Sequence, residues 1–394
     1  MKVAGLFSGI GGLELPFKSF GAETLLLCDV WDASQKVLAK RFDGVPVCGD
    51  IEDVKSLPSS VQIVTAGFPC TDLSQAGKTA GIGGAESGLV SNVFRLLKSR
   101  KIEWLVLENV RNMLVLDKGR AMDFLTAELE SLGFRWAYRL VDSRFSGVPQ
   151  RRHRVLFVAS RHHDPRQVLF ADETDGCGPD ALRDDAFGFY WTEGLRGLGW
   201  AQDAVPPLKG GSSVGIPSPP AIWMPNEKPG RRFVTPSIED AEALQGFPRE
   251  WTAPAQDGRR NGPRWKLVGN AVTVGVAEWL VERLLKPGEV VIESKLWEAG
   301  KKWPNAAFGE KGAVWEFKAS HWPRNRTYQH LTDLLTHDDL RPLSQRASKG
   351  FLERAARSRL NFKPEFIADL QDHVVSEVGR LSDVGKQSYE RAVA

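Results

Sequence analysis

The segment AGFPCTDLSQAG, residues 66–77, places a single cysteine, Cys70, directly after a proline and an apolar run. A thiol in this position can act as a nucleophile, bind a metal ion or pack as a small core residue. The glycine-rich stretch that follows, to Gly88, is typical of a segment that closes over a substrate, although a simple flexible connection has the same composition. Because no histidine stands near Cys70 in the sequence, a paired Cys–His nucleophile is not indicated.

Polar residues also stand where two other predicted strands end or begin. Glu108 and Asn109 close LVLENV, where a partly buried carboxyl group can donate a hydrogen bond or a proton near neutrality; it can equally cap a turn. Gln150, Arg152 and Arg154 alternate in GVPQRRHRV, and alternate residues of a strand face the same side. Arginines at such a place bind phosphate groups or the carbonyl of a base, or they form a solvated basic surface.

A glycine cluster, LFSGIGGLE, separates a predicted strand from a predicted helix. Gly9, Gly11 and Gly12 allow the backbone to pass close to a ligand at a helix N-terminus, although a tight turn needs the same residues. The spacing is neither the dinucleotide motif G-x-G-x-x-G nor a P-loop. Asp29 and Asp50 end the next two units, and an acidic residue at such a position commonly holds ribose hydroxyls. Together these residues predict a cofactor that carries a nucleoside.

Short apolar runs and helical patterns alternate over residues 1–160. Runs such as ETLLLCD, VQIVTAGF and EWLVLENV predict strands, and AMDFLTAELESLGF has apolar residues at helical spacing. This alternation predicts an α/β fold with a doubly wound sheet, in which ligands bind beyond the carboxyl ends of the strands. The glycine cluster, the two aspartates, Cys70 and Glu108 all fall there.

The remainder of the chain departs from this pattern. From residue 161 it is rich in glycine and proline, and an amphipathic helix returns at residues 269–285. Residues 289–394 open with several tryptophans and end in helical patterns, one of them basic. We expect three units, namely a catalytic domain at 1–187 and 263–287, an irregular or β-rich domain at 188–262, and an extension of unassigned role at 288–394.

The composition is typical of a soluble globular protein. The chain has 394 residues, 42% hydrophobic and 26% charged, with a formal net charge of +3. No apolar run nears the roughly 20 residues that cross a bilayer, and the N-terminus lacks a signal-peptide pattern, which favours a cytoplasmic protein without a membrane partner. The four cysteines form no C-x-x-C pair, so neither a zinc site nor a disulfide framework is expected. Cys28 and Cys48 are best interpreted as buried, inert thiols.

In order along the chain, FSGIGG, GFPC, ENV, QRRHR, LQGFP and GNAV resemble the motif series of the bacterial DNA cytosine-5 methyltransferases. The resemblance spans residues 3–285. It implies a Rossmann-like core that depends on S-adenosylmethionine, a smaller target recognition domain, and a C-terminal, mainly helical extension. The implied enzyme transfers a methyl group from S-adenosylmethionine to carbon 5 of a cytosine flipped out of a specific duplex DNA sequence. It leaves S-adenosylhomocysteine and uses no metal ion.

The resemblance also implies roles for individual residues. Cys70 would add covalently to carbon 6 of the base, and Glu108 would offset the charge that develops toward ring nitrogen 3. Arg154 would bind the base carbonyl, with Arg152 supporting the site. The S-adenosylmethionine pocket would comprise Phe7, Ser8, Gly9, Ile10, Gly11, Asp29, Val30, Asp50, Ile51, Pro69, Leu89, Asn270 and Val272. The resemblance does not identify the DNA site. Candidate DNA contacts, any one of which can equally form a plain solvated surface, are Thr71, Ser74, Lys78, Gln150, Arg231, Arg232, Arg259 and Arg260.

Two positions depart from the family pattern. Thr71 follows the cysteine where relatives usually carry glutamine, which puts the usual mode of base flipping or loop closure in doubt. Glu239 and Asp240 stand where the family often has Arg-Glu, which puts the usual structural anchoring there in doubt.

The expected partner is duplex DNA, bound by a monomer in the nucleoid-associated cytoplasm, with a cognate restriction endonuclease acting separately. Two alternatives stay open: a tRNA cytosine-5 methyltransferase, and a DNA-binding module that has lost catalysis. The long recognition region favours DNA over tRNA. The retention of Cys70, Glu108 and Arg154 favours an enzyme.

Overall fold

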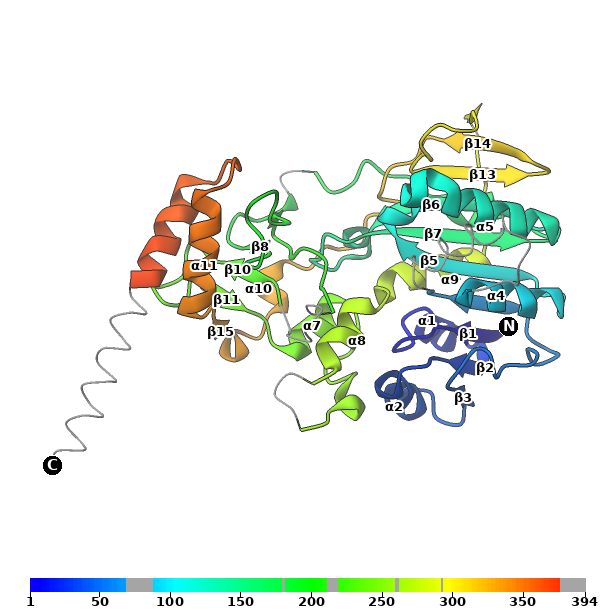
Figure 1. Cartoon of the computed structure of the whole chain (residues 1–394), viewed down its shortest axis with the longest axis horizontal. Coiled ribbons are helices and arrows are strands. Elements are labelled where there is room, and N and C mark those ends of the chain that lie inside the picture. The colour runs from blue at the N-terminus through cyan, green and yellow to red at the C-terminus, as the bar shows by residue number, and fades with distance from the viewer. Residues whose placement is uncertain (69–87, 179–180, 211–218, 259–261, 292, 376–394) are drawn as a thin grey trace.

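Two lobes of unequal size lie side by side, joined through the region of α7 and α8 (Figure 1). The computed structural model describes residues 1–68, 88–178, 181–210, 219–258, 262–291 and 293–375. Within these ranges the large lobe contains a ten-stranded sheet and the small lobe a five-stranded sheet. No helix in this described part of the chain is long and apolar enough to cross a membrane.

Parallel strands form one half of the large sheet. β1 (Lys2–Leu6) pairs with both β2 (Glu23–Cys28) and β4 (Ile63–Ala66), and the parallel series continues outward to β3 (Val47–Cys48) and β5 (Trp104–Val110). β1, β4 and β5 are almost wholly buried, because helices cover both faces, and this is why they stand in the sequence as continuous apolar runs. Their carboxyl ends meet at one edge of the sheet.

The next two strands form an antiparallel insertion. β7 (His153–Ser160) runs between β5 and β6 (Arg135–Asp142) and is antiparallel to both. The register pairs Arg154, at the start of β7, with Val110, at the end of β5. The basic entry of β7 therefore lies at the same edge of the sheet as the acidic end of β5.

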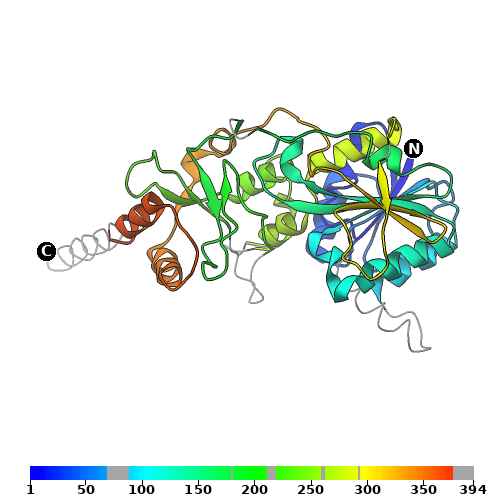
Figure 2. The ribbon, with the colours of Figure 1, turned by 90° about the horizontal axis from the view of Figure 1, so that it is seen from above.

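Helices cover both faces of the large sheet (Figure 2). On one face, α4 (Leu89–Lys98) and α5 (Arg120–Ser131) pack on the strands, and α4 buries Val90, Val93 and Phe94 at helical spacing. The other face and the β3 end carry α1 (Leu15–Ser19), α6 (Arg166–Leu169), α9 (Val274–Leu285) and α2 (Asp32–Arg41). Short 3-10 helices are η1 (Arg111–Leu114), η2 (Leu116–Gly119), η3 (Ser143–Ser146), η5 (Ala253–Ala255) and η6 (His337–Asp339).

The start of the predicted C-terminal extension adds strands to the large sheet. β13 (Ala306–Glu310) pairs with β6, and β14 (Ala313–Phe317) and β12 (Ser294–Leu296) follow, all antiparallel. The ring of Trp303, in the loop before β13, lies 6.1 Å from that of Trp136 of β6. These residues therefore belong to the large lobe.

The small sheet has the strand order β15-β11-β10-β8-β9, and its neighbouring strands are antiparallel. Its strands are β8 (Phe187–Phe189), β9 (Ala201–Gln202), β10 (Ala221–Trp223), β11 (Phe233–Thr235) and β15 (Arg341–Pro342). The accompanying helices are α7 (Ile238–Leu244), α8 (Arg264–Asn270), α10 (Leu331–Leu334), α11 (Gln345–Ala356) and a helical stretch at residues 364–375. The doubly wound core, the β-rich small lobe and the helical C-terminal region confirm the predicted fold class.

The core of the small lobe is aromatic and includes C-terminal residues. Phe366 is fully buried, and its ring centroid lies 5.2 Å from that of Phe189, 5.4 Å from that of Trp223 and 5.6 Å from that of Phe233. Phe351 of α11 is buried in the same cluster. The chain after β14 therefore completes the core of the small lobe. The division of the chain at 188, 263 and 288 stays a prediction.

Candidate active site

A cavity of about 410 Å³ lies at the carboxyl ends of β1 and β2, with α8 forming one wall. Most of the predicted cofactor residues line it: Phe7, Gly9, Asp29, Val30, Asp50, Ile51, Leu89 and Asn270. The predicted residues that do not line it are Ser8, Ile10, Gly11 and Val272. Pro69 lies outside the described residues.

Asp29 fixes the glycine turn beside this cavity. Its carboxylate accepts hydrogen bonds from the backbone N–H of Gly9 at 2.8 Å and of Trp31 at 3.0 Å. Burial raises the pKa of the Asp29 carboxyl group, and the two backbone N–H groups partly offset that rise. Gly9 has φ of +58°, which favours glycine, and a Cβ on Gly11 would lie 2.3 Å from the ring of Phe42. The turn therefore needs Gly9 for its backbone conformation and Gly11 for the space beside Phe42.

Glu108 and Arg154 form an ion pair at the same edge of the sheet. Arg154 Nε lies 2.9 Å from Glu108 Oε1, and the two side chains are only 13% and 10% exposed. Arg154 also donates from Nη1 to the carbonyl of His153 at 2.7 Å. Burial lowers the pKa of Arg154, and the Glu108 carboxylate opposes that change. A carboxylate and a guanidinium group thus stand together where a polar substrate group could meet both.

The chain that leads to Cys70 is held beside this pair. Asn109 donates from Nδ2 to the carbonyl of Phe68 at 3.0 Å, and Gly67 donates its N–H to the carbonyl of Leu6 at 3.4 Å. A Cβ on Gly67 would lie 3.9 Å from Glu108 Oε2, so the carboxylate reaches this segment. Cys70 itself, with Thr71, Ser74 and Lys78, lies outside the described residues.

Arg152 has a different environment from the one expected. It is fully buried, and its guanidinium group donates to the backbone carbonyls of Leu208 at 3.4 Å, Gly269 at 3.1 Å and Ala271 at 2.9 Å. Burial and the charge of Arg154 lower the pKa of Arg152. Arg152 therefore ties the entry of β7 to the segment that carries Asn270, rather than facing the cavity.

Two predicted DNA contacts are engaged with protein atoms instead. Gln150 is fully buried; its amide donates to the carbonyl of Leu244 at 2.9 Å and accepts from the N–H of Leu208 at 3.0 Å. Arg232 pairs with Asp369 of the C-terminal helical stretch. The other predicted contacts differ: Arg231 is exposed, whereas Arg259 and Arg260 lie outside the described residues.

The unusual Glu239-Asp240 pair is firmly anchored. Asp240 forms a capping box with Ser237 at the start of α7 and an ion pair with Arg249 at 2.7 Å. Glu239 pairs with Arg264 at 3.0 Å. The start of α7 is therefore anchored although Arg-Glu is absent, because the two acidic residues pair with Arg249 and Arg264.

Sequence reasoning missed three residues at or near the cavity. Lys266 and Trp31 both line it, and the Lys266 ammonium group lies 4.9 Å from the centre of the Trp31 ring. Lys266 ends the basic segment DGRRNGPRWK, and its position four residues before Asn270 is the signal that could have identified it. Glu14, just after the glycine cluster, is buried and accepts a hydrogen bond from Thr65 at 2.6 Å.

The comparisons with known proteins agree with the motif series. The sequence profile described as C-5 cytosine-specific DNA methylase matches residues 1–175. The type II methyltransferase M2.BsuMI of Bacillus subtilis is 46% identical over 384 residues, which cover 94% of this chain and 97% of that protein. The type II methyltransferase M.SsoII of Shigella sonnei is 28% identical over 310 residues, 72% of this chain and 80% of that protein.

A solved structure has the same fold. The Dnmt2 methyltransferase of S. pombe superimposes with a TM-score of 0.54 at 16% identity, over 73% of this chain and 98% of that one. At this identity the likeness supports the fold alone. The sequence comparisons carry the assignment further: the chain belongs to the C-5 cytosine-specific DNA methylases and is a DNA cytosine-5 methyltransferase that uses S-adenosylmethionine.

Proposed function

We propose that this chain is the modification enzyme of a type II restriction–modification system and methylates carbon 5 of one cytosine in a specific duplex sequence. The name of its Bacillus subtilis relative supports the type II assignment. The observation that carries the proposal is the Glu108–Arg154 pair, 2.9 Å apart at the edge of the sheet where the chain leads to Cys70. A cognate restriction endonuclease would act separately, and the enzyme would act on DNA as a monomer in the cytoplasm, near the nucleoid.

The cavity at the strand ends fits S-adenosylmethionine. The Asp29 carboxylate is fixed by two backbone N–H groups and retains acceptor capacity for ribose hydroxyls. Phe7 and Trp31 offer aromatic surface for an adenine ring, and Asp50 and Ile51 close the same wall. When bound, this cofactor supplies an electrophilic methyl group. The same residues provide no cluster of the kind that holds a metal ion within the described ranges.

Cys70 is the proposed nucleophile. Its thiolate forms a bond to carbon 6 of the cytosine, and the ring electrons move to carbon 5, which then takes the methyl group. Removal of the proton on carbon 5 and departure of the Cys70 thiolate restore the aromatic ring. The base must leave the helix stack to reach the thiol, at an unstacking cost of a few kcal/mol.

Glu108 and Arg154 act on the polar edge of the base. A proton shared between Glu108 and ring nitrogen 3 offsets the negative charge that develops there during thiolate addition. Arg154, held by Glu108 and the carbonyl of His153, directs its remaining N–H groups to the base carbonyl. Arg152 acts indirectly, because it joins the start of this strand to the backbone on either side of Asn270, at the end of α8.

The proposal predicts transfer of labelled methyl groups from S-adenosylmethionine to duplex DNA by the purified protein. Cys70→Ser should abolish transfer while S-adenosylmethionine binding persists, and Cys177→Ser, outside the site, should leave transfer unchanged. Bisulfite sequencing of DNA from expressing cells would give the modified sequence. Transfer to tRNA alone would reassign the substrate, and full activity of Cys70→Ser would overturn the mechanism.

A further inference from the structure

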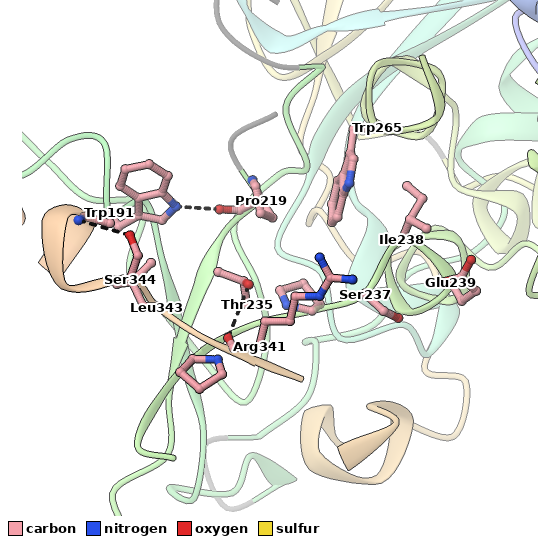
Figure 3. Close-up of a pocket in the computed structure, with 13 residues that line it drawn as sticks. Trp191, Pro219, Thr235, Ser237, Ile238, Glu239, Trp265, Arg341, Leu343 and Ser344 are labelled. Carbon is pink, nitrogen blue, oxygen red and sulfur yellow. Dashed lines mark hydrogen bonds between the residues drawn. The ribbon is translucent and has the colours of Figure 1, made fainter. Parts of the chain in front are cut away.

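A second cavity, of about 530 Å³, lies in the small lobe and shares α8 with the cofactor cavity (Figure 3). Its walls come from the loop of Trp191, the start of α7, the α8 residue Trp265, and β15 with the start of α11. We propose that this cavity contacts the DNA backbone next to the target cytosine, with Arg341 on a phosphate group and Trp191 and Trp265 against the adjoining sugar. This inference rests on the proposed function.

The position of the cavity fits a duplex that delivers a base to the cofactor site. Trp265 lines this cavity, whereas its neighbours Lys266 and Leu267 line the cofactor cavity. α8 has seven residues and is therefore about 10 Å long, which is the rise of about three base pairs. A duplex whose cytosine reaches the cofactor site would consequently pass within a few base pairs of Trp265.

Among the described residues that line the cavity, Arg341 is the cation without a charged partner. Figure 3 shows the Arg341 side chain reaching from β15 into the space between Trp265 and Ser237. Arg341 is exposed, and within the described ranges its guanidinium group has no ion pair or hydrogen bond. The carboxylate in the wall, Glu239, pairs with Arg264 at 3.0 Å, and Arg264 also pairs with the buried Glu242 at 3.0 Å. Arg341 is therefore the described cation of this wall that is available to a phosphate group.

Several hydroxyl groups of the wall already form hydrogen bonds. The hydroxyl groups of Ser237 and Ser344 accept from backbone N–H groups as helix caps, and Thr235 donates to the carbonyl of Arg341 at 3.4 Å. Hydroxyl groups that accept as caps keep an O–H to donate, which a phosphate group accepts. A guanidinium group with such hydroxyls and aromatic surface suits a phosphate with its sugar better than the edge of a base, which needs several aligned donors and acceptors.

The aromatic walls are held in place by the C-terminal segment. Trp191 donates from its indole N–H to the carbonyl of Pro219 at 2.9 Å. Arg354 of α11 donates to the backbone carbonyls of Trp191 at 2.7 Å and Glu193 at 3.0 Å. The C-terminal segment thus supplies Arg341 and also fixes the loop of Trp191, which gives the predicted extension a role in DNA binding.

The test measures binding of a fluorescent duplex by anisotropy at several salt concentrations, for the full chain and three variants at position 341. Arg341→Gln should weaken binding of cognate and unrelated duplexes alike, on the order of fivefold, and should reduce the slope of log Kd against log salt by about 0.9. Arg341→Lys should retain most of the affinity, because a phosphate group accepts a point charge. Arg341→Glu should weaken binding further.

The matched control is Lys295→Gln, which removes an exposed cation from β12 at the far edge of the large sheet. It should change neither the affinity nor the slope. Unchanged binding by Arg341→Gln would overturn the proposal. The proposal would also be overturned if Arg341→Gln weakened binding of the cognate duplex alone and Arg341→Lys weakened it equally, because that pattern indicates recognition of a base. Absence of methyl transfer by the unmodified chain would instead refute the proposed function, because the anisotropy measurement does not depend on catalysis.

Discussion

Arg154 Nε and Glu108 Oε1 lie 2.9 Å apart, one at the start of β7 and the other near the end of β5. The antiparallel register of these two strands creates this contact, because it places the entry of β7 against the exit of β5. Both side chains are largely buried, so each charge depends on the other. The pair therefore combines a structural role with the proposed recognition of the base.

Glu108→Gln should reduce methyl transfer by about 100-fold or more, the range expected when a positioned acid or base is lost. The amide keeps the size of the side chain but can neither give up a proton nor neutralise Arg154. The measurement is single-turnover transfer of labelled methyl groups. Glu103→Gln, in the residue before β5, serves as the control. Equal rates for both variants would contradict the role of Glu108.

Asp29→Asn should weaken S-adenosylmethionine binding by about tenfold, or 1.4 kcal/mol. The amide retains one acceptor for the N–H groups of Gly9 and Trp31 but loses charge and acceptor capacity for ribose hydroxyls. Calorimetric titration of the cofactor gives the dissociation constant. Asp32→Asn, three residues later on the exposed start of α2, should bind the cofactor normally. Equal weakening in both variants would argue against a specific contact.

Phe366→Ala should destabilise the small lobe by about 3 to 5 kcal/mol, the usual cost of deleting a buried phenylalanine ring. Most of the cofactor cavity lies against the large sheet and only one wall comes from α8, so S-adenosylmethionine binding should be weakened less than DNA methylation. Thermal unfolding followed with and without cofactor separates the two lobes. Phe362→Ala, at a partly exposed neighbouring ring, should cost less. Loss of cofactor binding in Phe366→Ala would show that the lobes unfold together.

Glu14→Gln should remove a pH dependence of folding stability. Burial raises the pKa of Glu14 from 4.5 to about 7, and the hydrogen bond from Thr65 partly offsets that rise. The folded state therefore holds this proton more tightly than the unfolded state does. The resulting stabilisation is full below pH 4.5 and is lost as the pH rises to about 7. At about 1.4 kcal/mol per pKa unit, the loss amounts to about 3 kcal/mol.

Urea unfolding between about pH 5 and pH 8 tests this expectation. The denaturation midpoint of the unmodified chain should fall across that range more than the midpoint of Glu14→Gln does. Glu23→Gln, at the exposed start of β2, should follow the unmodified chain. Parallel curves for Glu14→Gln and the unmodified chain would mean that Glu14 carries no proton in the folded state.

The sequence predicted those parts of the fold and site that depend on local pattern. Buried parallel strands have apolar runs, so β1, β4 and β5 were recognisable, and Asp29 and Glu108 could be placed at strand ends. Arg152 and Gln150 were assigned to the site or to DNA because they alternate in one strand. Their actual partners, the backbone at residues 208, 244 and 269–271, come from distant segments that no local pattern reveals.

Local sequence patterns also could not predict how the C-terminal residues pack against the small lobe. β15 has two residues, too few for any periodicity, and its partner strand lies a hundred positions earlier. The burial of Phe366 depends on rings contributed by three separate strands. Such contacts follow from tertiary structure, so no local sequence pattern could join this region to the small lobe.

C-terminal residues pair with both sheets, and this limits how DNA specificity can be exchanged between related enzymes. Residues 306–310 pair with the large sheet, whereas residues 341–342 pair with the small one. An exchange of residues 188–262 between relatives would transplant the predicted target recognition domain without the edge strand β15 and without part of its core. A functional chimaera would need a second graft beginning near β15, and natural recombination would have to carry both segments together.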